Sequence, residues 1–157
     1  MNSQNLKEAG FVGWIPVLEA GRDSSVPDLP GIYAVIYAEG RPEKWPPTSC
    51  GGWHKGRDPV VPLDRLALEW VDGTDIVYVG KAEQTLAKRL GELARFGAGE
   101  AVPHWGGRMI WQLPKVAALT VCWMPSPEKG GAGRDEVKLL QAFVAAHGRL
   151  PFANLRL

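Results

Sequence analysis

The chain has 157 residues, 45% of them hydrophobic and 22% charged, which excludes a disordered or fibrous protein and suits one compact domain. Its net charge of +1 excludes nucleic-acid binding through bulk positive charge, so any such binding requires a local patch. The two cysteines, Cys50 and Cys122, have neither the spacing of a metal knuckle nor that of a disulfide framework. We expect both to be reduced thiols.

The sequence carries no apolar run long enough for a membrane span, and its N-terminus lacks the basic and then apolar order of a signal peptide. We therefore expect a cytoplasmic protein with no membrane partner. The basic residues are unevenly placed, since Lys and Arg outnumber Asp and Glu by six to three between Val79 and Lys115. That region is where a local patch would form.

The first half of the chain predicts one strand followed by a long irregular segment. Residues 1–30 read as an N-terminal extension that packs on the domain formed by residues 31–157. "GIYAVIYA" alternates in a way typical of a strand and places Tyr33 and Tyr37 on one face. Residues 39–74 are rich in Pro and Gly, which predicts an insertion loop, with one short helical stretch in "LDRLALEWV".

The second half predicts two strands and two helices. "DIVYVG" is typical of a strand with Ile76 and Tyr78 on one face, and "LTVCWM" of another. "TLAKRLGELARFG" predicts a helix that ends at Gly97, with Arg89 at the border of its apolar stripe. "EVKLLQAFVAAHG" predicts a helix capped by Gly148. The fold class is thus α/β of the α+β kind: a small three-stranded antiparallel sheet flanked by helices, in the order β-β-α-β-α.

Glu136 is the residue that this fold does not explain. It falls in the first turn of its predicted helix and in the middle of the apolar stripe. A carboxylate that points toward a core must be paired, protonated or bound to a cation. The alternative is a glutamate that complements the helix dipole or pairs with an arginine.

Five features in order resemble the GIY-YIG nuclease superfamily, over nearly the whole chain after residue 30. The first motif is Gly31-Ile32-Tyr33, and the second is Tyr78-Val79-Gly80-Lys81. The remaining features are an arginine on the next helix, a glutamate on a later helix and a late asparagine, matched by Arg89, Glu136 and Asn154.

The chain departs from the family pattern in two ways. The two tripeptides usually lie much closer together, so residues 39–74 look like an insertion into a hairpin, which chain entropy tolerates. Many members carry a histidine one turn after the arginine, where this chain has Leu93. His104 in "PHWGGR" is a candidate to replace it in space.

The resemblance implies a phosphodiesterase centre with one divalent ion. Glu136 would hold Mg²⁺, with Mn²⁺ able to substitute, and Arg89 would face the scissile phosphate. Tyr33 is the first choice for activating water, with Tyr78 as its orienting partner or as the alternative base. A phenolate at neutral pH needs nearby positive charge, because tyrosine has an ordinary pKa of about 10. Lys81 or the metal could supply that charge.

Three further residues have supporting roles in this interpretation. Gly31 and Gly80 are structural, and Gly80 would permit either a close backbone approach or a tight exit from its strand. Asn154 would fix Glu136 or the loop beneath it, while its alternative is an ordinary turn asparagine.

Nucleic-acid contacts are expected from basic residues that lie near aromatic ones. The insertion offers Trp53 with its neighbours, although Trp53 could instead anchor the loop. The candidates are Trp53, His54, Lys55, Arg57, Lys88, Arg95 and Arg108. The sequence thus predicts a metal-dependent DNA endonuclease, with RNA not excluded and a homodimer possible for double-strand cleavage. The alternative is a GIY-YIG-like nucleic-acid-binding module that has lost turnover.

Overall fold

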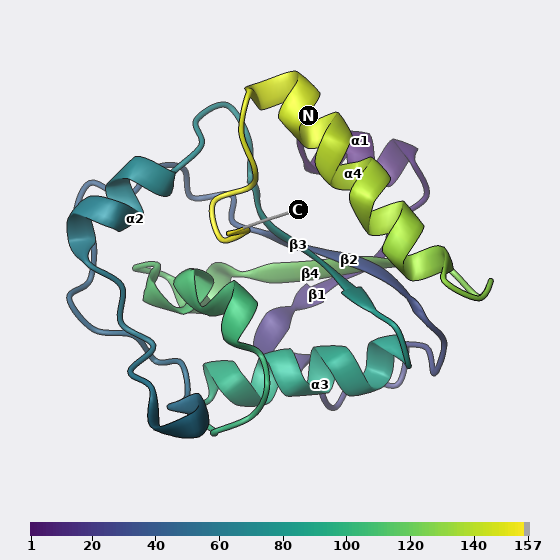
Figure 1. Cartoon of the computed structure of the whole chain (residues 1–157), viewed down its shortest axis with the longest axis horizontal. Helices are drawn as coiled ribbons and strands as arrows, with labels where there is room; N and C mark the ends of the chain where they lie inside the picture. Colours follow the sequence, from purple (N-terminus) through teal and green to yellow (C-terminus); the bar gives the residue numbers. More distant parts are fainter. Residues whose placement is uncertain (156–157) are drawn as a thin grey trace.

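The computed structural model describes residues 1–155, which form a four-stranded antiparallel sheet in the order β1-β4-β2-β3 (Figure 1). The strands are β1 (Val12–Pro16), β2 (Gly31–Ile36), β3 (Ile76–Ala82) and β4 (Thr120–Pro125). The α+β class is confirmed, and the three predicted strands correspond to β2, β3 and β4. The predicted number of strands was wrong, because the N-terminal segment supplies β1 as an edge strand. Gly13 and Trp14 both have positive φ, and the register shifts between Gly13 and Ile15, so β1 lacks a regular strand pattern.

Helices cover both faces of the sheet (Figure 1). The α-helices are α1 (Ser3–Glu8), α2 (Leu63–Glu69), α3 (Leu86–Gly97) and α4 (Gly131–His147). Short 3-10 helices are η1 (Val17–Glu19), η2 (His54–Gly56), η3 (Trp105–Gln112) and η4 (Val116–Ala118). Apolar residues of α3 and η3 pack in one core, and those of α1 and α4 pack in the other. No helix in the described part of the chain is long and apolar enough to cross a membrane.

Both predicted helices exist, and their ends have local causes. α3 begins after Thr85, whose hydroxyl accepts a hydrogen bond from the Lys88 backbone N–H at 3.1 Å. α4 ends at Gly148, which has a φ of 74° as predicted for its cap. It begins at Gly131 rather than at Glu136, because Gly130 turns the chain with a φ of 69°. Glu136 therefore lies beyond the first turn of α4.

A bulge in β3 changes which residues share a face. Val35 lies opposite Tyr78, while the next residue, Ile36, lies opposite Ile76, so Val77 is the extra residue. The prediction that Ile76 and Tyr78 share a face was therefore wrong, since Ile76 packs in the core beneath α4 and Tyr78 in the core beneath α3. Tyr33 and Tyr37 do share the α3 side, as predicted. The bulge leaves Tyr78 on the same side as Tyr33.

The insertion 39–74 is packed against the domain and contains η2 and the predicted helical stretch, α2. Trp70 packs with Trp45 and Phe152, with ring centroids 5.4 to 5.8 Å apart. The buried Gln112 amide fixes two turns of the insertion to η3. It accepts from the Val61 N–H at 2.8 Å and donates to the carbonyls of Val61 and Pro46 at 3.0 and 2.9 Å. The insertion is thus a fixed part of the fold.

Candidate functional site

A cleft of about 380 Å³ lies where the end of β3 meets α3 and α4. Its lining comes mainly from polar and charged side chains: Tyr78, Lys81, Glu83, Gln84, Thr85, Lys88, Arg89, Glu92 and Glu136. The four of these that the resemblance singled out, Tyr78, Lys81, Arg89 and Glu136, thus meet in one place. They come from three separate elements, so only the fold brings them together.

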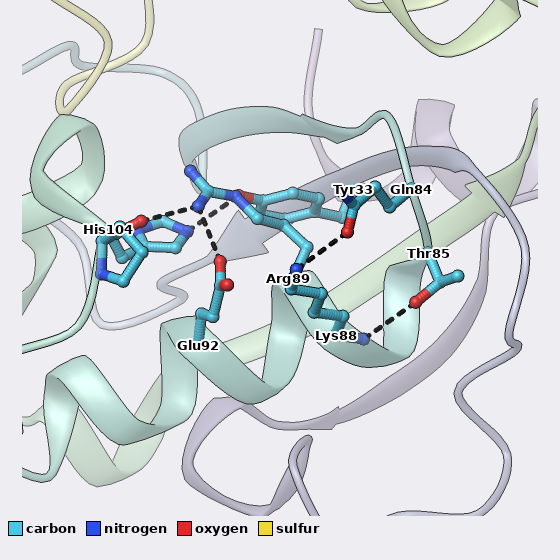
Figure 2. Close-up of polar contacts among 8 residues, drawn as sticks. Tyr33, Gln84, Thr85, Lys88, Arg89, Glu92 and His104 are labelled. Atoms are coloured by element: carbon cyan, nitrogen blue, oxygen red, sulfur yellow. Dashed lines mark hydrogen bonds and ion pairs between the residues drawn. The ribbon is translucent and has the colours of Figure 1, made fainter.

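Tyr33 lies beneath this cleft and contacts a histidine that is distant in sequence. Its hydroxyl is 2.9 Å from His104 Nε2, and both side chains are fully buried (Figure 2). A Cβ added at Gly80 would come within 2.5 Å of Tyr33 Cζ, so only glycine leaves room for this ring. A close approach is therefore the role of Gly80, and a tight exit is not, because β3 continues to Ala82.

Gly31 is also placed where the fold allows no larger residue. A Cβ there would lie 2.5 Å from the Met124 carbonyl oxygen and 2.8 Å from Leu86 Cδ1. The glycine thus lets β2 approach both β4 and α3. Its close packing explains the glycine at the start of the first tripeptide.

The two tyrosines differ in access and in acidity. Tyr33 is 0% exposed and does not line the cleft, whereas Tyr78 is 7% exposed and does. Burial raises the pKa of Tyr33 well above its ordinary value, and the neighbouring Tyr78 raises it further. Burial also raises the pKa of Tyr78, but Arg89 and hydrogen bonding from Tyr33 oppose that rise. Tyr78 is the tyrosine that ionises more readily and faces the cleft.

His104 is a neutral imidazole in this environment. Burial, together with the positive charge of Arg89, lowers the pKa of His104 to about 3. Its Nδ1 has no hydrogen-bond partner among the described residues. His104, the candidate to replace the histidine that is absent at Leu93, thus lies in contact with Tyr33.

Arg89 is the cation nearest to both tyrosines. Its Nη1 donates to Glu92 Oε2 at 3.0 Å and to the Pro103 carbonyl at 2.7 Å, which fixes the position of the guanidinium (Figure 2). The charge of Arg89 lowers the pKa of each tyrosine, as the causes of their shifts show. Arg89 is thus one source of positive charge for the tyrosines, although burial still raises the pKa of both.

Glu136 lies at the mouth of the cleft with 19% of its side chain exposed, and its predicted place in the core was wrong. The reason is that α4 passes over β3 with Leu140 and Phe143 facing the sheet, which leaves Glu136 at the margin. Lys81 Nζ is 3.4 Å from Glu136 Oε2 and 3.2 Å from Glu83 Oε1. Burial raises the pKa of Glu136, and the charge of Lys81 opposes that rise. The carboxylate thus has one cationic partner and an open side.

The carboxylates of the cleft suit an ion that takes one or two protein ligands better than an ion that is surrounded by protein ligands. No group of three or more His, Cys, Asp and Glu side chains within residues 1–155 is arranged to hold a metal. Mg²⁺ commonly uses one or two carboxylates and completes its shell with water and phosphate oxygens. Glu136, with Glu83 nearby, fits that mode of binding.

Asn154 contacts β3, and neither of the contacts predicted for it, to Glu136 or to a loop beneath it, is present among its hydrogen bonds. Its Oδ1 accepts from the Val79 N–H at 2.9 Å, and its Nδ2 donates to the Val79 carbonyl at 2.8 Å. Together with a bond from the Ala153 N–H to the Val77 carbonyl at 2.8 Å, these contacts pair the C-terminal segment with the outer edge of β3. Asn154 therefore holds the strand that carries Tyr78.

The predicted nucleic-acid contacts fall at different distances from the cleft. Lys88 lines the cleft. Arg95 pairs with Glu100 at 2.7 Å and lines neither this cleft nor its neighbouring groove. Trp53 is 58% exposed, whereas the anchoring contacts of the insertion come from other residues. His54 and Lys55 follow Trp53 in η2.

Two arginines of the prediction, Arg57 and Arg108, meet at a tryptophan that sequence reasoning missed. Their guanidinium carbons lie 4.5 and 4.6 Å from the ring centroid of Trp105. Trp105, Arg108 and the likewise unpredicted Arg65 line a groove of about 930 Å³ that shares Tyr78, Lys81 and Glu136 with the cleft. In the sequence, only the position of Trp105 directly after the candidate His104 could have indicated that this tryptophan lies near the site.

Comparison of the chain with protein-family models, with curated proteins and with solved structures found no match.

Proposed function

We propose that this protein is a metal-dependent endonuclease that hydrolyses phosphodiester bonds in DNA through a single centre of the GIY-YIG kind. The supporting observation is that Tyr78, Arg89 and Glu136 line one cleft, with Tyr33 and His104 hydrogen-bonded beneath it. A phosphodiesterase needs an activated water, charge stabilisation at the phosphoryl oxygens and help for the leaving oxygen. Each of these three requirements has a candidate among these side chains.

Glu136 would hold Mg²⁺, or Mn²⁺ in its place, with Glu83 within reach as a second carboxylate. When bound, the ion neutralises charge on the phosphoryl oxygens and on the departing 3′-oxygen. Lys81 would keep the two carboxylates together before the ion arrives. Arg89 would face the phosphate from the α3 side of the cleft, with the planar, permanently charged fork that suits phosphate oxygens.

Tyr78 is our choice for the group that accepts the proton of the attacking water, because Tyr78 faces the cleft and Tyr33 does not. His104 would donate Nε2–H to the Tyr33 hydroxyl, and Tyr33 would donate its own proton toward Tyr78. This series of hydrogen bonds and the charge of Arg89 would favour the phenolate of Tyr78 against burial, which raises the pKa of Tyr78. The phenolate takes the water proton, the hydroxide attacks phosphorus, and the 3′-oxygen leaves and is protonated by solvent.

Plasmid nicking in Mg²⁺ with Glu136→Gln tests this function. We expect the wild-type chain to convert supercoiled DNA to nicked DNA and the variant to lose at least about 100-fold in rate, since a carboxamide is a poor ligand for Mg²⁺. The matched control is Glu128→Gln, an exposed carboxylate outside the cleft that pairs with Arg134. It should cleave at the wild-type rate.

The same assay separates the endonuclease from the binding-only alternative. A wild-type chain that binds DNA and RNA but cleaves neither in Mg²⁺ or Mn²⁺ would contradict our proposal and favour a module without turnover. Equal cleavage by wild type and Glu136→Gln would instead show that Glu136 is not needed for cleavage.

A further inference from the structure

The groove beside the cleft adds residues of the insertion and of η3 to residues shared with the cleft, and neither the insertion nor η3 supplies a motif residue. Its volume is about 930 Å³, and it is lined by Arg65, Trp105, Gly106, Arg108 and the C-terminal segment together with the shared Tyr78, Lys81 and Glu136. Because the two hollows share three residues, a strand whose phosphate lies in the cleft extends into the groove without leaving the surface.

Trp105 contacts two arginines: Arg108, which lines the groove, and Arg57, which is next to the groove through its contact with the Trp105 ring. Arg57 arrives from the segment after η2, and Arg108 lies one helical turn beyond Trp105 in η3. A guanidinium that stacks on an aromatic ring loses rotational freedom but keeps its N–H edges available for planar anions. Since its ring already contacts both guanidiniums, Trp105 serves as a support for the arginines rather than as a free platform for a base.

Of the three arginines Arg57, Arg65 and Arg108, two have no carboxylate partner within ion-pair distance in the described part of the chain. Within residues 1–155, neither Arg57 nor Arg108 lies within ion-pair distance of a carboxylate, and Arg65 reaches only Glu69, at 3.9 Å. Burial and the charges of Arg65 and Arg57 lower the pKa of Arg108. Three cations that repel one another around a hollow are stabilised when an anion binds between them.

We propose that Arg57, Arg65 and Arg108 form a second phosphate site that holds the backbone of the DNA strand next to the scissile phosphate. This inference rests on the proposed function for the identity of the strand. In this proposal the insertion contacts the phosphate backbone of the DNA. Binding through this site is therefore independent of base sequence. Gln112 fixes the insertion to η3, and we infer that it thereby keeps Arg57 and Arg65 of the insertion close to Arg108 of η3.

The test is the salt dependence of DNA binding in EDTA, measured by fluorescence anisotropy on duplexes of about 20 base pairs with two unrelated sequences. Each phosphate contact contributes about 0.9 to the slope of log K against log salt for a duplex. The Arg57→Ala/Arg65→Ala/Arg108→Ala variant should reduce the slope by about 2 to 3 and weaken binding at least about tenfold, equally for both sequences.

The control carries the same change in net charge elsewhere on the surface. Arg22→Ala/Arg41→Ala/Arg134→Ala removes three exposed arginines that do not line the groove. It should bind with the wild-type slope, and both triple variants should keep melting temperatures close to wild type. An equal loss in the two triple variants, or a loss in neither, would overturn the phosphate site.

Cleavage assayed separately distinguishes failure of this site from failure of the proposed function. Binding that depends on the three groove arginines without any cleavage would support the phosphate site and contradict the endonuclease. Cleavage by wild type together with unaltered binding by the groove variant would support the endonuclease and overturn the phosphate site. A slope that changes for only one of the two sequences would overturn its independence of base sequence.

Discussion

His104 is the residue whose surroundings depart furthest from its ordinary chemistry. It is buried between Tyr33 and η3, and the cation Arg89 is nearby, so both solvent exclusion and charge favour the neutral ring. A neutral imidazole can donate Nε2–H to Tyr33 without adding positive charge to a buried position. In our proposal His104, as a neutral ring, therefore positions Tyr33.

The lowered pKa of His104 predicts a specific loss of stability in acid. The unfolded chain takes up a proton at this residue below about pH 6.5, whereas the folded chain does so only near pH 3. Between these values the unfolded state binds more protons, so the stability gained from His104 falls as the pH falls. The expected loss is at most about 1.4 kcal/mol per pH unit.

Denaturant unfolding of wild type and His104→Gln from pH 7 to pH 4 measures this effect. Carboxylates titrate alike in both proteins, so the difference between their free energies of unfolding isolates His104. We expect the advantage of wild type to shrink steadily on acidification. A difference that stays constant over this range would contradict a neutral buried His104.

Sequence alone identified the residues that meet in the cleft but not how each one points. Glu136 was expected to point toward the core because of its wheel position in the apolar stripe, yet it lies at the margin of the sheet, and α4 starts at Gly131, five residues before it. Asn154 was expected near Glu136, and its amide instead pairs with the Val79 backbone. A helical wheel shows which face of a helix a residue lies on. It does not show whether that residue lies over the middle of the sheet or at its margin, because this depends on tertiary packing.

At the scale of elements, β2, β3 and β4 and the two longer helices, α3 and α4, could be predicted from their hydrophobic patterns. β1 could not, since a bulge and two positive φ angles break its alternation. η3 could not be predicted either, because Gly106 and Gly107 precede its run of buried residues from Met109 to Gln112 and interrupt any helical pattern.

The insertion shows how an irregular segment acquires a fixed position. Its hydrogen bonds to Gln112 are buried, and its aromatic residues pack with Phe152 from the end of the chain. These contacts connect segments distant in sequence, so no local pattern could reveal them. The composition of residues 39–74 thus correctly predicted an irregular backbone. It did not indicate that this backbone packs in a fixed position against the domain.

Gln112→Leu tests whether this amide fixes the insertion. The substitution leaves the Val61 N–H and the carbonyls of Val61 and Pro46 without their partner in a buried place. We expect a loss of about 1 to 3 kcal/mol in the free energy of unfolding. Gln141→Leu, at an exposed position of α4, is the matched control and should change stability by less than about 0.5 kcal/mol. Equal stability of the two variants would rule out the anchoring role.

At the scale of the whole molecule, the end of β3 and the N-terminal ends of α3 and α4 lie toward one side of the sheet, and the insertion and η3 lie toward the other side (Figure 1). The close pair of Tyr33 and Tyr78 requires β2 and β3 to be neighbours, which the insertion between them does not prevent. Their ring centroids are 6.1 Å apart. The two tripeptides thus lie side by side despite the sequence between them.

The most direct test of one phosphodiesterase centre is the single-turnover rate of DNA cleavage in Mg²⁺ by Tyr78→Phe. This change removes only the hydroxyl that we propose accepts the water proton, so it should lower the rate by at least about 100-fold with little change in melting temperature. Tyr37→Phe, a buried tyrosine of the same core, is the control and should cleave at the wild-type rate. Cleavage by Tyr78→Phe at the same rate as Tyr37→Phe would contradict the account.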